Sequence, residues 1–377
     1  MNRTALSLAC LALALIASPA LAQPVTPPPI AARAYVLIDT LSGQVLAEQA
    51  ADEPFEPASL TKLMTAYLVF AAIRDGKLDL AKPVAVSQKA WKAIGSRMFI
   101  EPRKPATGAD LLRGMIVQSG NDATIALAEA VAGTEETFAQ WMNREAKRLG
   151  MKNTNFVNAS GLPAANHYAS ARDLAILAAA LIRDFPDRYP LYAEREFAWN
   201  GIRQANRNRL LWADSSVDGV KTGFTEAAGY CLISSARRGE RRLISVVMGA
   251  QSDALRMSES QKLLNFGFLN YDTRRVQKQG DTVASFPVYK GTRGTLAVGF
   301  DRDVWLTLPP ERFQGLQAEL RAQQPFVAPL AKGQKAGIMR LHRDGTTLAE
   351  LPVVALDDVP VGGFLTRGWD TLRLLFR

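Results

Sequence analysis

The chain has 377 residues, 48% of them hydrophobic and 21% charged, which is enough for one to three globular domains. The net charge of +9 favours contact with an anionic surface or polymer. Because the basic residues are scattered and form no long run, nucleic acid is the least favoured of these partners. Usual zinc sites are nearly excluded, since the chain has only two histidines and two cysteines.

The first 22 residues predict a secretory signal peptide, so the mature protein is expected to be exported. Asn2-Arg3 supplies the positive charge, an apolar stretch runs from residue 5 to residue 16, and the segment ends in an A-x-A site at Ala22. This apolar stretch is too short to span a bilayer. After cleavage, Cys231 is the one remaining cysteine, so an internal disulfide is excluded.

The segment from residue 33 to residue 270 predicts one α/β domain. Strand patterns stand at both of its ends and helical patterns between them, and the close spacing of the strands favours antiparallel hairpins. The expected elements are a hairpin over 34–49, helices over 58–74, 109–117, 121–132, 137–149 and 170–183, a strand over 219–224 and a hairpin over 228–250.

Two further segments follow this domain. Residues 275–358 are Val-rich and punctuated by Gly and Pro, which predicts a small β-rich domain. Residues 360–377 predict an amphipathic helix, with Phe364, Leu365 and Trp369 on its apolar side and arginines opposite. A helix at a lipid surface is the favoured interpretation, and a terminal helix docked on the protein is the alternative.

Ser59 and Lys62 begin an otherwise apolar helical pattern. At positions i and i+3 they project from the same face of the helix, and a serine in the first turn lies near unpaired N–H groups. A buried lysine loses its proton readily and can then activate a serine. A Ser-His-Asp site would instead have to recruit His167, because His342 lies in the β-rich segment.

Two more short motifs make this pair specific. S-x-x-K alone is expected about once by chance in a chain of this length. Ser119-Gly120-Asn121 falls between two predicted helices, and Lys221-Thr222-Gly223 falls on a predicted strand. The three motifs in this order form a recognised set.

With these motifs, the sequence resembles the low-molecular-mass penicillin-binding proteins that act as serine-type D-alanyl-D-alanine carboxypeptidases. The stretches P-A-S-L-T-K, S-G-N-D-A, S-G-L-P and V-D-G-V-K-T-G-F carry the resemblance, which covers roughly residues 33–270. It implies an α/β fold of the β-lactamase/transpeptidase type, with an antiparallel sheet and a helical subdomain. Serine and lysine suffice for this chemistry, so no metal or organic cofactor is implied.

The resemblance also implies roles for individual residues. Ser59 is the nucleophile, Lys62 takes its proton, and Ser119 and Lys221 pass the proton to the departing D-alanine. The backbone N–H groups of Ser59 and Phe224 form the oxyanion hole. The implied substrate-binding residues are Asn121, Lys221, Thr222, Gly223, Phe224, Arg256 and, as a weaker candidate, Arg207. Phe224 departs from the histidine that many relatives carry at this position.

Three alternatives remain open at this stage. A class A β-lactamase needs a deacylating glutamate, and the lookalike Glu196-Phe-Ala-Trp-Asn200 is itself predicted to be a strand. A D,D-endopeptidase would use the same motifs, whereas a non-catalytic wall scaffold would need none of them. The expected partners are peptidoglycan stem peptides, β-lactam antibiotics as covalent inhibitors, and the periplasmic face of the cytoplasmic membrane, through the terminal helix.

Overall fold

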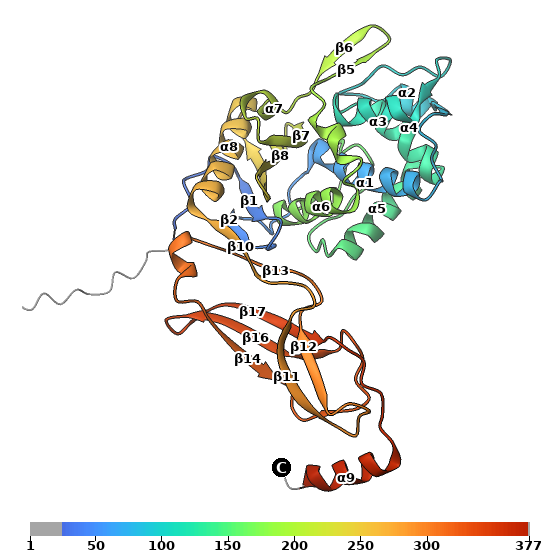
Figure 1. The fold of residues 1–377 in the computed structure, drawn as a ribbon. Helices are drawn as coiled ribbons and strands as arrows, with labels where there is room; N and C mark the ends of the chain where they lie inside the picture. Colours follow the sequence, from blue (N-terminus) through green and yellow to red (C-terminus); the bar gives the residue numbers. More distant parts are fainter. Residues whose placement is uncertain (1–24, 376–377) are drawn as a thin grey trace, which may run out of the picture.

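A computed structural model describes residues 25–375 of the chain. It contains an α/β domain, a β-rich domain and a terminal helix at the far end of the molecule (Figure 1). The predicted signal peptide lies outside the described residues, and so do Phe376 and Arg377 of the predicted terminal helix.

A five-stranded antiparallel sheet with the order β2-β1-β9-β8-β7 forms the centre of the first domain. The first strand therefore lies beside the last, with Ala34 opposite Met248. This arrangement confirms the predicted hairpins and their antiparallel pairing. The strands are β1 (Ala34–Asp39), β2 (Val45–Gln49), β7 (Val217–Thr225), β8 (Gly229–Arg238) and β9 (Arg241–Ala250).

Helices cover both faces of this sheet (Figure 1). Val36 packs into the core under α1 and α6, whereas its neighbour Leu37 packs into the core under α8, because successive strand residues point to opposite faces. The helices are α1 (Lys62–Arg74), α2 (Gln88–Trp91), α3 (Gly108–Ile116), α4 (Asn121–Ala132), α5 (Glu135–Leu149), α6 (Ala171–Asp184), α7 (Leu210–Ala213) and α8 (Asp253–Asn270).

Helix α1 lies at the centre of the helical layer, where it contacts α3, α4, α5 and α6. Apolar residues therefore surround the whole helix, and even Lys62 at its start is buried. A 3-10 turn, η1 (Ala58–Thr61), precedes α1 and carries Ser59. The remaining elements of this domain are η2 (Tyr189–Ala193) and the short ribbons of β3 (Pro83–Val84) with β4 (Ala106–Thr107) and β5 (Glu196–Trp199) with β6 (Ile202–Ala205).

The second domain is a six-stranded sheet with the order β14-β16-β17-β12-β11-β15. Its pairs are antiparallel except that β11 and β15 run parallel. A ribbon of β10 and β13 connects it to α8, and β10 begins at Asp272, earlier than the expected domain start at residue 275. The elements are β10 (Asp272–Gln277), β11 (Thr282–Tyr289), β12 (Thr295–Gly299), β13 (Val304–Leu308), η3 (Pro310–Phe313), β14 (Gln317–Ala322), β15 (Phe326–Val327), β16 (Lys335–Arg343) and β17 (Thr346–Ala355).

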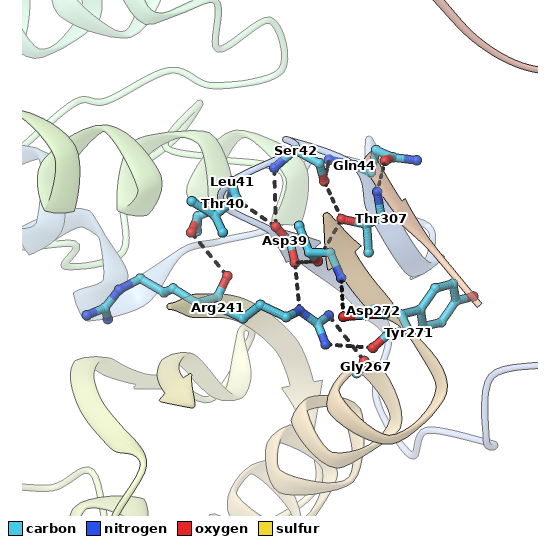
Figure 2. A network of polar contacts seen from close by, with 12 residues as sticks. Asp39, Thr40, Leu41, Ser42, Gln44, Arg241, Gly267, Tyr271, Asp272 and Thr307 are labelled. Carbon is cyan, nitrogen blue, oxygen red and sulfur yellow. Dashed lines mark hydrogen bonds and ion pairs between the residues drawn. The ribbon is translucent and has the colours of Figure 1, made fainter. Parts of the chain in front are cut away.

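A buried polar network joins the two domains, and Figure 2 shows it from close by. The fully buried Asp39 at the end of β1 accepts a hydrogen bond from Thr273 Oγ1 at 2.6 Å and pairs with Arg241 at 3.3 Å. Arg241 also donates to the Tyr271 carbonyl at 2.6 Å. Further bonds join Ser42 to Thr307, Thr273 to Thr307 and Gln44 to Thr307. The β1–β2 turn is thereby held against β10 and β13.

The terminal helix α9 (Phe364–Leu375) begins later than residue 360, where it was predicted to start. The reason is that the preceding segment is extended: Val361 forms a bridge with Gly291, and Gly362 N–H donates to the Lys290 carbonyl at 2.8 Å. The apolar side chains of α9 are exposed, with Phe364 88% and Leu365 85% accessible. No helix within residues 25–375 is long and apolar enough to cross a membrane.

Candidate active site

Ser59 lines a cleft of about 690 Å³ that lies between η1, α4, β7 and α8. Strand β7 can pass directly over η1 because Gly223 has no side chain: a Cβ there would lie 3.0 Å from the Pro57 carbonyl oxygen. Of the predicted site residues, the cleft is lined by Ser59, Ser119, Asn121, Arg207, Thr222, Gly223, Phe224 and Arg256. The other two, Lys62 and Lys221, are buried.

The Lys62 side chain reaches back to Ser59 from the first residue of α1. Its Nζ lies 2.8 Å from Ser59 Oγ, 2.6 Å from Asn121 Oδ1 and 2.6 Å from the Ser160 carbonyl oxygen. Burial lowers the pKa of Lys62 to about 7, and nearby Arg207 acts in the same direction. A large fraction of Lys62 is therefore neutral near pH 7 and able to accept a proton from Ser59.

Lys221 on β7 is a second buried lysine in the same region. Its Nζ donates to the Thr222 carbonyl oxygen at 3.0 Å. Burial holds its pKa well below the usual value, and the positive charges of Lys62, Arg207 and Arg256 lower it further. Two lysines and two arginines thus concentrate positive charge at the cleft. Their mutual repulsion favours the neutral form of the two lysine amines, and their charge attracts anionic groups into the cleft.

The loop before α4 brings Ser119 and Asn121 to the cleft. Ser119 has a left-handed backbone, with φ of 66°, and its buried Oγ has no hydrogen-bond partner among the described residues. Asn121 is oriented by its amide, which donates to the Ile94 carbonyl at 2.7 Å. A buried hydroxyl without a hydrogen-bond partner is costly. The Ser119 hydroxyl is therefore available to bind a ligand or to transfer a proton, and it makes no structural hydrogen bond within the part of the chain that the structure describes.

Asp122 fixes this loop, although no role was predicted for it. Its buried carboxylate accepts the backbone N–H groups of Met98, Phe99, Ile100 and Ala123 at 2.8–3.2 Å. The carboxylate therefore ties the start of α4 to the segment that forms one wall of the cleft. The sequence signal for Asp122 was its place directly after Ser119-Gly120-Asn121.

Two arginines line the cleft. Arg256 on α8 is 7% exposed, donates to the Gly223 carbonyl at 3.0 Å and forms an ion pair with Asp253. Burial lowers the pKa of its guanidinium. Arg207 is exposed and donates to Ser96 Oγ at 2.9 Å. The buried Arg256 is positioned more rigidly, and both can meet an anion in the cleft.

Phe224, which follows Lys221-Thr222-Gly223, lies against Tyr230 with 4.4 Å between the ring centroids. Its side chain is 44% exposed and contributes an apolar surface to the cleft. No ionisable side chain stands at this position.

His167 takes no part in a Ser-His-Asp arrangement. The Val157 N–H donates to its Nδ1 at 3.0 Å, and its Nε2 lies 2.8 Å from Thr61 Oγ1. Burial lowers the pKa of His167 to about 4, so the ring is neutral near pH 7. A neutral ring that accepts at Nδ1 carries its proton on Nε2 and donates it to Thr61. His167 therefore supports the chain behind Ser59.

Comparison with known proteins identifies the family of the chain. The family model for D-alanyl-D-alanine carboxypeptidases matches residues 21–252, and the one for the C-terminal domain of penicillin-binding protein 5 matches residues 271–361. The D-alanyl-D-alanine carboxypeptidases DacC and DacA of Escherichia coli are 43% and 44% identical to the chain. These alignments cover 94% and 93% of the chain and 90% and 89% of the two relatives.

Solved structures agree with these matches. Penicillin-binding protein 5 from Haemophilus influenzae is 41% identical and superposes with a TM-score of 0.86, covering 89% of this chain and 99% of that one. Penicillin-binding protein D2 from Listeria monocytogenes, solved in its ampicillin-bound form, is 32% identical with a TM-score of 0.60, covering 64% of this chain and 99% of that one. The chain therefore belongs to the D-alanyl-D-alanine carboxypeptidase family of serine peptidases, the low-molecular-mass penicillin-binding proteins.

Proposed function

We propose that this protein removes the terminal D-alanine from peptidoglycan stem pentapeptides through an acyl-enzyme on Ser59. The observation that carries the proposal is the 2.8 Å contact between Ser59 Oγ and Lys62 Nζ, in a buried cluster that lowers the pKa of Lys62 to about 7. This arrangement gives a serine nucleophile with a base already within hydrogen-bonding distance.

In the acylation step, Lys62 takes the proton of Ser59 as its Oγ attacks the carbonyl carbon of the penultimate D-alanine. The tetrahedral oxyanion accepts hydrogen bonds from the backbone N–H groups of Ser59 and Phe224. The C–N bond then breaks as Ser119 and Lys221 pass the proton from Lys62 to the departing amine, which leaves Lys62 neutral again. In deacylation, neutral Lys62 takes a proton from the attacking water and returns it to Ser59 Oγ as the ester C–O bond breaks, which releases the shortened peptide and restores the enzyme.

Substrate selection depends on the free carboxylate of the terminal D-alanine. Arg256 and Thr222 are the proposed partners, because a guanidinium binds a carboxylate with two parallel hydrogen bonds. Arg207, which also lines the cleft, adds positive charge. Asn121 holds the peptide amide while its oxygen keeps Lys62 in place.

β-Lactam antibiotics are proposed to acylate the same serine, as the ampicillin-bound relative suggests. Fast hydrolysis of that adduct, as in a class A β-lactamase, would require a carboxylate beside the ester. Asp253 is the only carboxylate lining the cleft within residues 25–375, and it is paired with Arg256. Glu196 lies on β5, where it pairs with Arg203. We therefore favour slow hydrolysis of the penicillin adduct.

The proposed location is the periplasmic face of the cytoplasmic membrane. Helix α9 is held to the second domain by Asp370, whose carboxylate accepts the Lys290 N–H at 2.6 Å. With Asp370 facing the domain, the side chains of Phe364, Leu365 and Trp369 face outward. Such a surface suits insertion at a lipid boundary, with the arginines near anionic headgroups.

The decisive experiment is D-alanine release from an acyl-L-Lys-D-Ala-D-Ala peptide. Wild-type protein should release D-alanine, Ser59→Ala should not, and Ser258→Ala, on an exposed part of α8, should match the wild type. No release from folded wild-type protein would reject the carboxypeptidase. Cleavage of cross-linked dimers in that case would indicate a D,D-endopeptidase, and activity on neither substrate would indicate a wall scaffold.

A further inference from the structure

Helix α5 begins with a buried carboxylate that the reaction steps above do not use. Glu135 is only 6% exposed, whereas the side chain of its neighbour Glu136 is 73% exposed. A buried carboxylate is costly unless it is paired and hydrogen-bonded. Its contacts therefore indicate what it does.

The contacts of Glu135 connect it to Lys62, the proposed general base. One carboxylate oxygen accepts the Ala159 N–H at 3.0 Å, and the other pairs with Lys89 Nζ at 2.9 Å. Ala159 directly precedes Ser160, whose carbonyl accepts the hydrogen bond from Lys62 Nζ at 2.6 Å. The N–H held by Glu135 and the carbonyl that holds Lys62 thus belong to adjacent residues.

The other sides of this loop are also held. Thr65 Oγ1, one turn after Lys62 on α1, donates to the Ala159 carbonyl at 2.6 Å. Gly161 packs so closely on the turn before Ser59 that a Cβ there would lie 1.8 Å from the Ala58 carbonyl oxygen. The loop is therefore clamped between α1 and α5, and Glu135 is the only α5 side chain hydrogen-bonded to Ala159 or Ser160 among the described residues.

Glu135 also contributes to the charge around Lys62. Two carboxylates act on this amine, Asp122 from α4 and Glu135 from α5. The positive charge of Arg207 opposes them, and the charge of Lys62 in turn lowers the pKa of the buried Lys221 on β7. Both carboxylates raise the pKa of Lys62, against the larger lowering by burial.

We propose that Glu135 is a positioning residue for the general base: it sets the Ser160 carbonyl against Lys62 and supplies part of the field at the Lys62 nitrogen. This inference rests on the proposed role of Lys62. The inference assigns this role to Glu135 and not to its neighbour Glu136. Glu136 also pairs with Lys89, but it makes no hydrogen bond to Ala159 or Ser160 among the described residues.

That shared ion pair provides the test, because Glu135→Gln and Glu136→Gln each remove one carboxylate beside Lys89. The single amide oxygen in Glu135→Gln cannot serve both the Ala159 N–H and Lys89. Without the Glu135 charge the pKa of Lys62 falls, so neutral Lys62 persists to lower pH. The acidic limb of kcat/KM should move to lower pH by about half a unit to one unit in Glu135→Gln. In Glu136→Gln it should stay in place.

Two further readouts do not require turnover. The NMR titration of the Lys62 side chain should show the same downward shift in Glu135→Gln, and the Ala159 amide should exchange with solvent at least about tenfold faster. An unchanged titration and amide exchange would overturn the inference, even if D-alanine release is normal. A shift in protein that releases no D-alanine would support it and reject the proposed function alone.

Glu135→Asp is the second variant if Glu135→Gln does not fold. It keeps the charge and shortens the reach, so the Lys62 titration should stay close to wild type while Ala159 exchange accelerates and kcat falls. Wild-type exchange and kcat in this variant would also overturn the inference.

Discussion

The side-chain oxygen of Asn121 lies 2.6 Å from Lys62 Nζ and connects the first residue of α4 to the first residue of α1. The amide orientation is unambiguous, because Asn121 Nδ2 donates to the Ile94 carbonyl at 2.7 Å. The oxygen is thereby left to face the amine. Asn121 acts on Lys62 through position and dipole, without adding a charge.

Replacing Asn121 with Asp should raise the pH at which the enzyme becomes active. A carboxylate at 2.6 Å would stabilise the Lys62 ammonium and raise the Lys62 pKa above its value of about 7. More base would then be protonated at neutral pH. The acidic limb of kcat/KM, measured from about pH 5 to about pH 10, should move up by about one unit or more. A limb at the wild-type position would contradict the coupling.

Wild-type activity should itself depend on pH through Lys62. Since the pKa of Lys62 is about 7 and its neutral amine is the proposed base, kcat/KM should fall about tenfold per pH unit below that pH. Lys62→Arg, which keeps the charge and does not deprotonate, should lose at least about 10³-fold in acylation. The rate of covalent labelling by a fluorescent penicillin measures this step. Rapid labelling of Lys62→Arg would exclude Lys62 as the base.

Arg256→Ala should weaken recognition of the terminal carboxylate. Loss of a charge-assisted hydrogen bond costs about 1.5–3 kcal/mol, so kcat/KM should fall about 10- to 100-fold. A peptide ester lacking the free carboxylate should show little difference between the two proteins. Arg207→Ala should have a smaller effect, because that side chain is exposed. Equal losses for acid and ester would assign Arg256 a purely structural role.

Deletion of the chain from Phe364 onward should release the protein from lipid and leave its chemistry intact. The cut lies after Gly363, so the hydrogen bond from Gly362 N–H to the Lys290 carbonyl is retained. Co-sedimentation with vesicles containing anionic phospholipid measures binding, and hydrolysis of the soluble tripeptide is the control. Continued sedimentation of the truncated protein would reject α9 as the anchor.

Asp39→Ala should destabilise the junction between the domains. The change leaves Arg241 without its buried partner and Thr273 without its acceptor (Figure 2). Breaking such a pair costs about 3 kcal/mol, which thermal unfolding detects as a lower Tm. Asp75→Ala, at the exposed end of α1, removes a surface pair with Arg74 and should change Tm little. Similar Tm values for the two variants would contradict the buried-pair assignment.

The fold was largely predictable because its main elements have local signatures. Alternating and apolar runs indicated the hairpins at both ends of the first domain, and the helical periods indicated α3 to α6. The predicted start of α9 was wrong, because residues 360–362 pair with a segment around Gly291, which local periodicity does not report. The early start of β10 has the same cause, since its pairing with β13 is tertiary.

The sequence by itself determined the three motifs of the candidate active site, their order and the residue types able to do the proposed chemistry, because these are properties of short stretches. Tertiary structure decided which groups surround Lys62. The Ser160 carbonyl lies 98 positions from Lys62 in the chain, and Asp122 and Glu135 come from different helices. These groups meet only when α1 is buried among α3 to α6, and that burial is also what lowers the pKa of Lys62.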